Sequence, residues 1–403
     1  MDVWSRFAAQ RPGWSLEQPF YTDPTIFELE RQLWFPRQWM LMGHVAELPR
    51  KGAHIVRSLF NEEVLIVRAG EDDFRAFFNV CTHRGSRICK SDGHANLLVC
   101  PYHAWSFRLT GELQSRGEVP EGIDPDALGL HPVPIRVREG VIFCGLDAER
   151  LPDPTAALDA ITPALQHHGI ARTRVLERRS YPTRANWKLV MENFLECYHC
   201  RPAHPEYTSV NGHVAVLGAR DPDRVAQYQQ EVAAWLASCP DKAFNTKIWD
   251  PGGIEATAYG VSRTPLGDGR LTQSQDGRPV APLMGSFAEY DGGETAIRFG
   301  RLSFVGGLND HAILFQIIPR AVDLTDTVMT WLVDASATDI DVERVCWLWE
   351  ATTSQDKGIV EENAAGVRSG AYRPGPYTDL EPWSAWFIAN YLKEMSELAP
   401  AAV

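Results

Sequence analysis

The chain has 403 residues, of which 44% are hydrophobic and 10% aromatic, so it has enough apolar material for two ordinary domains with their own cores. The formal net charge of -13 disfavours a nucleic acid or an anionic membrane as partner, because such surfaces would repel the protein at long range. The sequence shows no run of about 18 apolar residues and no signal-like start, so we expect a cytoplasmic protein.

The predicted secondary structure divides the chain into three parts. Residues 1–45 are expected to be mainly helical and to pack on the last part, since "DPTIFELERQLWFPRQW" repeats apolar residues at roughly helical spacing. Residues 46–150 hold short β-branched and aromatic stretches between Gly, Asp or Asn turns, which predicts a small antiparallel β domain. Residues 151–403 mix helices with strands that follow one another directly, so the predicted fold class is α+β rather than doubly wound. The helices expected in this last part lie near 186–200, 340–365 and 380–397.

The β domain carries a paired Cys/His motif. "CTHRG" places Cys81 and His83 in one loop, and after sixteen residues "CPYHAW" places Cys100 and His103 in another. A structural zinc site uses the same ligand types, but zinc loops usually offer two cysteines or two widely spaced histidines. One thiolate and one imidazole from each loop fit a Rieske 2Fe–2S centre, in which two thiolates hold one iron and two imidazoles the other. The cysteines outside this motif, Cys89, Cys144, Cys239 and Cys346, are expected to be small buried or partly buried fillers.

A second polar stretch, "NWKLVMENFLECYHCRPAHPE", suggests a mononuclear metal site. On a continuous helix His199 and His204 would lie about 140° apart. Pro202 should end the helix near Cys200 and release His204 onto a turn that folds back. Two histidines and one carboxylate make the facial triad of non-haem Fe(II) oxygenases. Capping and salt-bridging roles would explain the same polar residues without a metal.

Over nearly its whole length the sequence resembles the α subunit of Rieske non-haem iron oxygenases, the aromatic ring-hydroxylating oxygenase superfamily. The motifs that carry the resemblance are "CTHRG", "CPYHAWSF", "ANWKLVMENFLECYHCRPAHPE" and "SQDKGIVEENAAGVRSGAY". The resemblance implies an N-terminal Rieske domain and a C-terminal helix-grip catalytic domain. It also implies that His199 and His204 hold the iron with a carboxylate of a C-terminal helix, matched here by Asp356, with Glu350 and Glu361 as alternatives. Asn193 matches an asparagine close to the iron, and Phe194 a pocket-lining position.

One departure from the family pattern bears on the substrate. Members that act on arenes usually carry Asp three residues before the first iron histidine, where this chain has Glu196. This feature, with "ENFLECYHC" and "GAYRPGPY", resembles the branch that oxidises glycine betaine, proline betaine (stachydrine), carnitine and choline. The resemblance therefore implies N-demethylation of a quaternary ammonium compound with release of formaldehyde; the alternative is hydroxylation or O-demethylation of an aromatic substrate. Aromatic faces attract an ammonium group; Trp249, Tyr259, Phe304 and Phe315 lie in the half of the chain that should build the pocket, but core packing is the better explanation for each.

The expected partners follow from what the chain lacks and from the family. No Gly-rich dinucleotide fingerprint or Walker loop is present, so a separate NAD(P)H-dependent flavin and iron–sulfur reductase should supply electrons, docking near Arg84, His103 and Trp105. The resemblance implies a homotrimer in which Glu196 links a cluster histidine of the next subunit to His199. A bare Rieske electron carrier is the remaining class; it would hold two irons per chain rather than about three.

Overall fold

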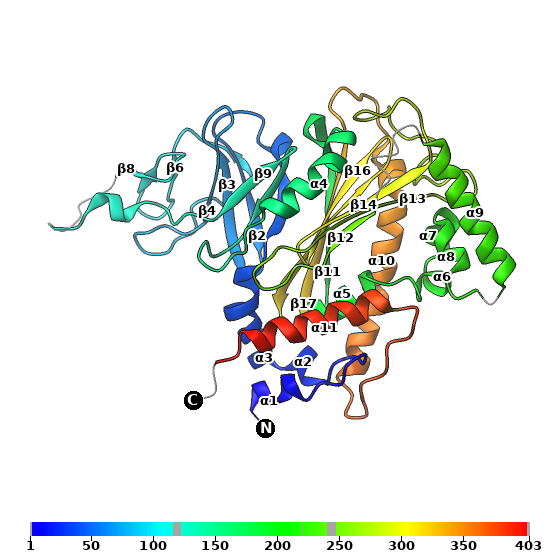
Figure 1. The fold of residues 1–403 in the computed structure, drawn as a ribbon. Coiled ribbons are helices and arrows are strands. Elements are labelled where there is room, and N and C mark those ends of the chain that lie inside the picture. The colour runs from blue at the N-terminus through cyan, green and yellow to red at the C-terminus, as the bar shows by residue number, and fades with distance from the viewer. Residues whose placement is uncertain (1, 116–121, 220, 240–246, 401–403) are drawn as a thin grey trace.

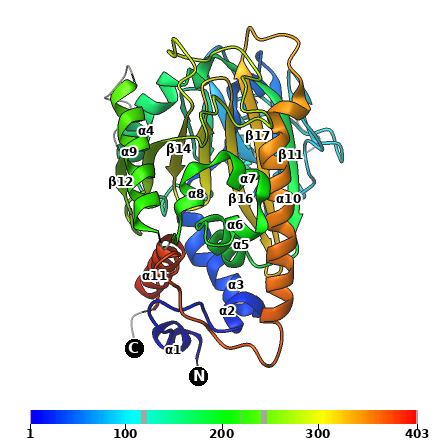
Figure 2. The same ribbon diagram turned by 90° about the vertical axis from the view of Figure 1, so that its right-hand side faces the viewer.

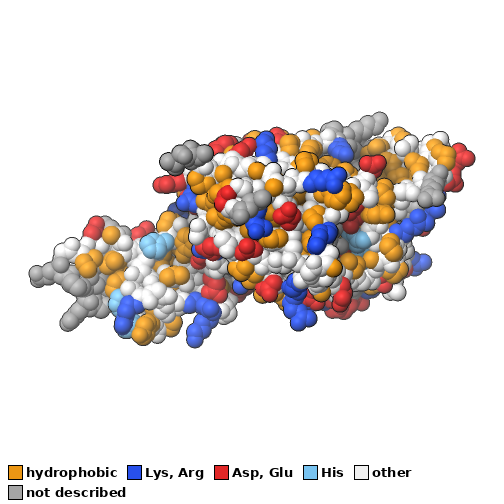
Figure 3. Space-filling model, turned by 90° about the horizontal axis from the view of Figure 1, so that it is seen from below, with side chains coloured by type: hydrophobic (Ala, Val, Ile, Leu, Met, Phe, Trp, Pro, Cys, Tyr) orange, Lys and Arg blue, Asp and Glu red, His pale blue; other side chains and the backbone are white. Residues whose placement is uncertain are grey.

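The computed structural model describes residues 2–115, 122–219, 221–239 and 247–400. Figure 1 shows an N-terminal β domain beside a larger C-terminal domain built on one wide sheet. Seen from below, the β domain projects as a narrow arm, and acidic, basic and hydrophobic side chains are interspersed over the larger body (Figure 3).

The chain begins with short helical turns, most of which start at an Asp or a Pro residue. They are α1 (Val3–Ala8), α2 (Pro19–Thr22), α3 (Pro24–Leu29), η1 (Glu30–Trp34) and η2 (Phe35–Arg37). The carboxylates of Asp2 and Asp23 accept backbone N–H groups at the starts of α1 and α3, which satisfies otherwise unpaired donors. Residues 40–44, for which helix was expected, instead form strand β1 (Met40–His44), because all five side chains are buried and the strand pairs with β10.

The β domain consists of small antiparallel sheets. One has the order β4-β3-β2-β5, with β2 (Ala53–Leu59), β3 (Glu62–Arg68), β4 (Phe74–Phe78) and β5 (Gly93–His94). A second joins β6 (Leu98–Val99), β7 (Ser106–Phe107) and β8 (Leu113–Ser115), and a third has the order β1-β10-β9, with β9 (Ile135–Arg138) and β10 (Val141–Cys144). Alternate residues of β3 enter two different cores, Val64 and Ile66 one and Leu65 and Val67 the other, as the period of a strand requires. Short 3-10 turns η3 (Val45–Glu47) and η4 (Pro125–Leu128) connect these elements, and a third, η5 (Ile170–Arg172), leads into the first strand of the C-terminal domain.

The C-terminal domain is a seven-stranded antiparallel sheet with helices on both faces. Its order is β11-β17-β16-β15-β14-β13-β12. The strands are β11 (Thr173–Thr183), β12 (Ile248–Asp250), β13 (Tyr259–Pro265), β14 (Gly293–Phe299), β15 (Ser303–Gly307), β16 (Ala312–Ala321) and β17 (Leu324–Asp334). Helix α4 (Thr155–His167) packs on one face, against β13 and β14. Figure 2 shows the other face behind α5 (Trp187–Phe194), α6 (Cys200–Ala203), α7 (Pro205–Val210), α8 (Gly212–Val216), α9 (Pro222–Ser238) and the long α10 (Val342–Val367).

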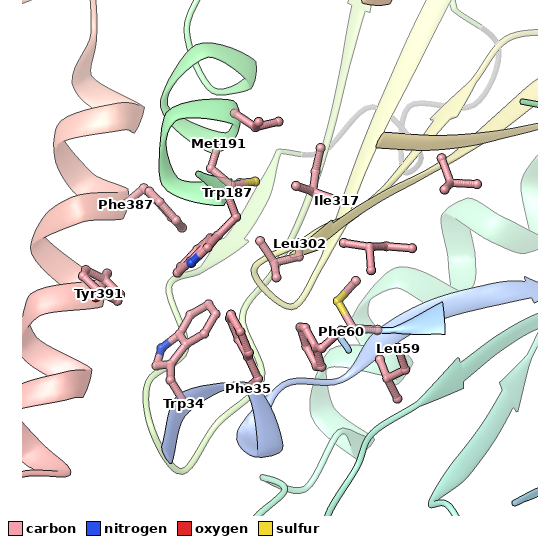
Figure 4. Close-up of a cluster of buried hydrophobic side chains, with 14 of the residues drawn as sticks. Trp34, Phe35, Leu59, Phe60, Trp187, Met191, Leu302, Ile317, Phe387 and Tyr391 are labelled. Carbon is pink, nitrogen blue, oxygen red and sulfur yellow. The ribbon is translucent and has the colours of Figure 1, made fainter. Parts of the chain in front are cut away.

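The N-terminal segment packs against the C-terminal domain through one aromatic core (Figure 4). Trp34 stacks on Trp187 of α5 with ring centroids 4.9 Å apart, and Phe35 stacks on Phe60 of the β domain at 4.5 Å. Tyr391 of α11 (Pro382–Glu397) meets both tryptophans edge to face. The two domains and the N-terminal segment therefore share buried apolar surface.

The helix expected over 186–200 is shorter than predicted, and the expectation that Pro202 ends it was wrong. Helix α5 stops at Phe194, and the Glu196 carboxylate then accepts the backbone N–H groups of Tyr198 and His199. That side chain competes with the helical hydrogen bonds and starts the next turn. Pro202 lies inside the first turn of α6, where its missing N–H has no helical partner to lose.

Candidate functional site

The two Cys/His loops of the β domain have the same backbone shape. The Gly85 N–H donates to the Cys81 carbonyl at 2.9 Å, and the Ala104 N–H donates to the Cys100 carbonyl at 3.0 Å. In each loop the fourth residue after the cysteine has a left-handed φ, 76° at Gly85 and 60° at Ala104. Such a backbone favours Gly and is uncommon for Ala. Each loop therefore turns its cysteine and its histidine towards the same region.

Burial separates the four side chains into two pairs. Cys81 and Cys100 are buried, each 2% exposed, whereas His83 and His103 are exposed with ring centroids 4.8 Å apart. The backbone N–H groups of Tyr102 and His103 hold the pKa of the Cys100 thiol below its ordinary value, although burial opposes this. Two buried cysteine sulfurs and two exposed imidazoles fit a two-iron cluster whose histidine side faces an electron partner.

His199 and His204 flank one short turn of helix. They are the residues immediately before and after α6, and their ring centroids lie 5.0 Å apart with the planes at 80°. Pro205 begins α7 directly after His204, so the backbone at His204 (φ -126°, ψ 78°) leaves the helical conformation. The two imidazoles therefore approach one point although they are five residues apart.

Hydrogen bonds fix which ring nitrogen of each histidine faces that point. The Nδ1 of His199 donates to Glu196, and the Nδ1 of His204 donates to Oε1 of Gln355 at 2.8 Å. Each Nε2 then faces Oδ1 of Asp356, at 3.2 Å from His199 and 3.0 Å from His204. The Nδ2 of Asn193 lies 3.1 Å from Nε2 of His199. Partners of this kind orient metal-binding imidazoles.

The charges at this point favour a bound cation. Burial alone would lower the pKa of His199, but Asp356 and Glu196 raise it to about 10. Burial alone would raise the pKa of Asp356, but the two histidines hold it below its ordinary value. The two carboxylates thus favour positive charge at this point, which a divalent iron would supply when bound.

The third ligand can be assigned by comparing the nearby donors. The Cys200 thiol also lies within 4.8 Å of the donor atoms of both histidines. Its neighbour Cys197, together with burial, raises its pKa far above the ordinary range, and a neutral thiol is a poor ligand. The carboxylate of Asp356, 3.0 to 3.2 Å from both Nε2 atoms, is the better donor.

The alternative carboxylates on α10 are engaged elsewhere. Glu350 pairs with Arg179 at 2.9 Å and also accepts the Tyr181 hydroxyl. Glu361 pairs with Lys357 at 2.7 Å and accepts the backbone N–H of Arg184 at 2.9 Å. Among the three candidates on this helix, only Asp356 contacts the histidines.

A cavity of about 480 Å³ opens beside these residues, between the sheet and the helices α6, α7 and α10. Phe194 lines it, and so do Trp249, Phe304 and Phe315, for which core packing was the favoured expectation. Tyr259 is not among the lining residues and packs against a neighbouring core.

Sequence reasoning missed two aromatic residues of this cavity, Tyr207 and Trp349, whose rings lie 5.6 Å apart. Tyr207 lies three residues after His204, and Trp349 lies two helical turns before Asp356 on α10. Helical spacing from the metal-binding positions was the signal that could have found them.

Comparison with known proteins agrees with this arrangement. Residues 38–123 match the Rieske [2Fe-2S] domain, and residues 170–397 match the ring hydroxylating alpha subunit (catalytic domain). The chain belongs to the Rieske non-haem iron oxygenase α-subunit family.

Two curated relatives of this family align over almost the whole chain. The glycine betaine monooxygenase oxygenase subunit of Chromohalobacter salexigens is 33% identical, over 99% of this chain and 91% of its own length. The subunit of the same name from Pseudomonas aeruginosa is 34% identical, over 96% and 89%. The quaternary ammonium Rieske monooxygenase CntA in complex with L-carnitine has the same fold, with a TM-score of 0.69 and 20% identity over 96% of this chain and 97% of its own.

As a Rieske oxygenase subunit, the chain is an oxidoreductase that uses a Rieske 2Fe–2S cluster and a mononuclear non-haem iron. The Cys/His motif left a structural zinc site open as an alternative. The Rieske family match and the buried thiol pair favour a 2Fe–2S cluster instead. Among the described residues, no helix combines the length and apolar character needed to cross a membrane.

The outer side of the iron site forms a depression of about 600 Å³ in the surface of the Rieske oxygenase. Glu196, Tyr198, His199 and Arg201 line one part of it, and Leu380 and Glu381 another. Glu196 is therefore reachable from outside while its carboxylate holds His199.

Proposed function

We propose that this chain is the terminal oxygenase component of a monooxygenase that N-demethylates a quaternary ammonium compound of the glycine betaine or proline betaine type. The carrying observation is that His199, His204 and Asp356 converge at the edge of a cavity lined by aromatic rings. The full-length relatives, both named glycine betaine monooxygenase oxygenase subunits, support this class of substrate.

The proposed metal ligands are those whose geometry is described above. Cys81, His83, Cys100 and His103 would hold the cluster, which accepts and passes single electrons when bound. His199, His204 and Asp356 would hold the iron, which leaves coordination positions open for O2 and substrate. Asn193 would lie beside the bound iron, since its amide nitrogen is 3.1 Å from the Nε2 atom of His199 that faces the metal position.

The aromatic wall would bind the substrate's ammonium group. Phe194 and Phe304 lie 4.7 Å apart, and Phe315 contacts Trp349 at 4.7 Å. A desolvated quaternary ammonium gains about 2 kcal/mol or more over such faces. Held there, an N-methyl carbon faces the iron site, and hydroxylation of that carbon gives a carbinolamine that releases formaldehyde.

Electrons would come from a separate NAD(P)H-dependent flavin and iron–sulfur reductase. The exposed side of the cluster offers His103 with Arg84, whose guanidinium also lies 4.9 Å from the Tyr102 ring. Trp105 is 5% exposed and stacks beneath His83, so it would contribute through that ring rather than by direct contact.

We further propose a homotrimer in the cytoplasm. The depression beside Glu196 would receive the cluster histidines of the next subunit, so that Glu196 links the two metal centres. No disulfide joins the cysteines of the described residues, as a reducing compartment permits.

The test uses the purified protein with a competent reductase, NADH and O2, and a panel of glycine betaine, proline betaine, carnitine, choline, vanillate and benzoate. Formaldehyde, trimethylamine and O2 uptake are measured together, because carnitine cleavage and choline oxidation release no formaldehyde. We expect formaldehyde that depends on one betaine, from protein with about three irons per chain. Turnover only with vanillate or benzoate would establish an aromatic substrate instead.

A further inference from the structure

Arg298 on β14 is a partly buried cation for which the described residues offer no anion. Its Nη1 atom is fully buried and has no hydrogen-bond partner, and no carboxylate pairs with the guanidinium within the described part of the chain. Burial, and then the nearby Arg301, lower the pKa of Arg298 to about 9. A buried N–H group of a cation that has no hydrogen-bond partner is unfavourable, so a native structure that keeps one calls for an explanation.

The strand carries Arg298 to the wall of the cavity. Glu294, Ala296 and Arg298 alternate along β14, all three line the cavity, and Thr295, Ile297 and Phe299 between them are buried. Opposite Ala296 lie Ser262 on β13 and Gly306 on β15. These small residues leave space beside the guanidinium.

The other cations of the cavity differ from Arg298. Arg263 makes two hydrogen bonds to Asp291, at 2.7 and 2.8 Å, and Lys247 is exposed to solvent. Arg298 is held instead by aromatic rings, with its guanidinium carbon 5.0 Å from Phe304, 5.1 Å from Trp249 and 5.4 Å from Trp386. These faces fix the guanidinium but do not satisfy its N–H donors.

A short row of contacts connects Arg298 to the iron site. The Phe304 ring lies between the guanidinium and Phe194, whose ring is 4.7 Å away. Phe194 is next in the chain to Asn193, which contacts His199. Arg298, these rings and the residues of the iron site all line the same cavity, so a ligand lying over the rings has Arg298 on one side and the iron site on the other.

We propose that Arg298 binds the carboxylate of a zwitterionic quaternary ammonium substrate, while the aromatic rings beside the iron site hold its ammonium group. This inference rests on the proposed function and narrows it to betaines, as opposed to choline or other compounds without a carboxylate. A planar guanidinium is suited to a carboxylate because it can donate two parallel hydrogen bonds.

The test measures binding to the oxidised holoprotein without reductase, so that no turnover occurs. Calorimetric titration with glycine betaine, proline betaine and choline compares wild type with Arg298→Met and Arg298→Lys. Loss of a charge-assisted contact should raise the Kd of the preferred betaine about 10- to 100-fold in Arg298→Met. We expect Arg298→Lys to recover part of the affinity, and we expect choline binding to be the same in all three.

Arg11→Met is the matched control, because Arg11 also lies over a tryptophan, 3.7 Å from the Trp14 ring, but is exposed and outside the cavity. It should bind betaine like wild type. If Arg298 merely supports the aromatic packing, Arg298→Met will lower the Tm and leave the Kd for betaine unchanged, which would overturn the inference.

The wild-type protein gives a second measurement that does not depend on any variant folding. Preference for a betaine over choline supports the inference, and equal or tighter binding of choline overturns it. Formaldehyde release from a betaine with unchanged Kd in Arg298→Met would leave the proposed function standing and reject Arg298. If betaine binding depends on Arg298 but no formaldehyde is released, the role of Arg298 stands and the proposed function is rejected.

Discussion

At the scale of single residues, the site depends on which atom of each side chain is already engaged. Glu196 and Gln355 hold the Nδ1 atoms of the two histidines, so both Nε2 atoms remain for a metal. The Glu196 carboxylate is also reachable from the outer depression. A neighbouring subunit that approaches there would give Glu196 a second role, that of linking the two metal centres.

Replacing Glu196 by Gln tests that second role. Gln keeps an oxygen that can accept from His199, so the iron and the cluster should both remain, while loss of the negative charge should reduce turnover about 10- to 100-fold. Iron content and the visible spectrum check the first expectation, and betaine-dependent O2 uptake checks the second. Glu196→Asp keeps the charge on a shorter side chain and should retain more turnover than Glu196→Gln. Unchanged turnover in the Gln variant would rule out a linking role.

At the scale of elements, the position of α5 depends on a buried ion pair. Lys188 and Glu30 are both 0% exposed, and the Lys188 ammonium donates to Oε1 of Glu30. Glu30 also accepts the Trp187 indole N–H at 2.8 Å and the Tyr391 hydroxyl. One carboxylate of the N-terminal segment thus holds two helices, α5 and α11.

Lys188→Met should therefore destabilise the protein by about 3–5 kcal/mol, because it leaves the Glu30 carboxylate buried without its cation. Urea unfolding of wild type and variant measures the difference. The double variant Glu30→Gln with Lys188→Met should recover much of the loss, since it removes both charges.

The matched control is Lys357→Met, in which the lost pair with Glu361 is partly exposed and should contribute less than about 1 kcal/mol. An equal, small effect of Lys188→Met and Lys357→Met would show that the buried pair does not stabilise α5.

At the scale of the whole molecule, the cluster and the iron site belong to different domains that share one core. Their side chains are presented on different parts of the surface, the cluster histidines on the arm and Glu196 in the depression of the larger body. This arrangement favours electron transfer between subunits in the proposed trimer.

Mixed oligomers test transfer between subunits. Cys100→Ser should inactivate the cluster and His204→Ala the iron site, so each variant alone should be inactive. Co-expressed in equal amounts, they should regain about a quarter of wild-type turnover if each interface of a closed ring works independently. No recovery in verified mixed oligomers would mean that electrons stay within one subunit.

The pKa values of two buried histidines predict how the free energy of unfolding of the protein falls in acid. Burial lowers the pKa of His44 to about 4 and that of His168 to about 3. Both are neutral in the folded state, whereas the unfolded chain takes up their protons near pH 6.5. Their contribution is thus complete above pH 6.5 and is lost as pH falls towards the folded values, by roughly 3 to 5 kcal/mol each.

Urea unfolding at a series of pH values from about 7 to about 4 measures this loss. His168→Gln removes one titrating group and should flatten the pH dependence, whereas His131→Gln, at an exposed histidine, should leave it unchanged. An identical slope in wild type and His168→Gln would contradict the assignment.

The sequence by itself determined those parts of the site that lie within one short segment. Cys81 with His83, Cys100 with His103 and His199 with His204 are each held by a few consecutive residues, so covalent spacing limits where their side chains can go. The α+β class and the helices near 340–365 and 380–397 were likewise predictable, because local periodicity shows them.

Only the tertiary structure decided what depends on packing between distant segments. Asp356, Glu350 and Glu361 lie on one helix, and it is the position of α10 against β11 and α5 that brings the first to the histidines, the second to Arg179 and the third to the backbone N–H of Arg184. Likewise, the sequence neighbours of Arg298 do not show that it lacks an anion, because the packing of distant strands and helices decides which carboxylates come near the side chain. Side-chain type and spacing are local, whereas partners and solvation are set by the fold.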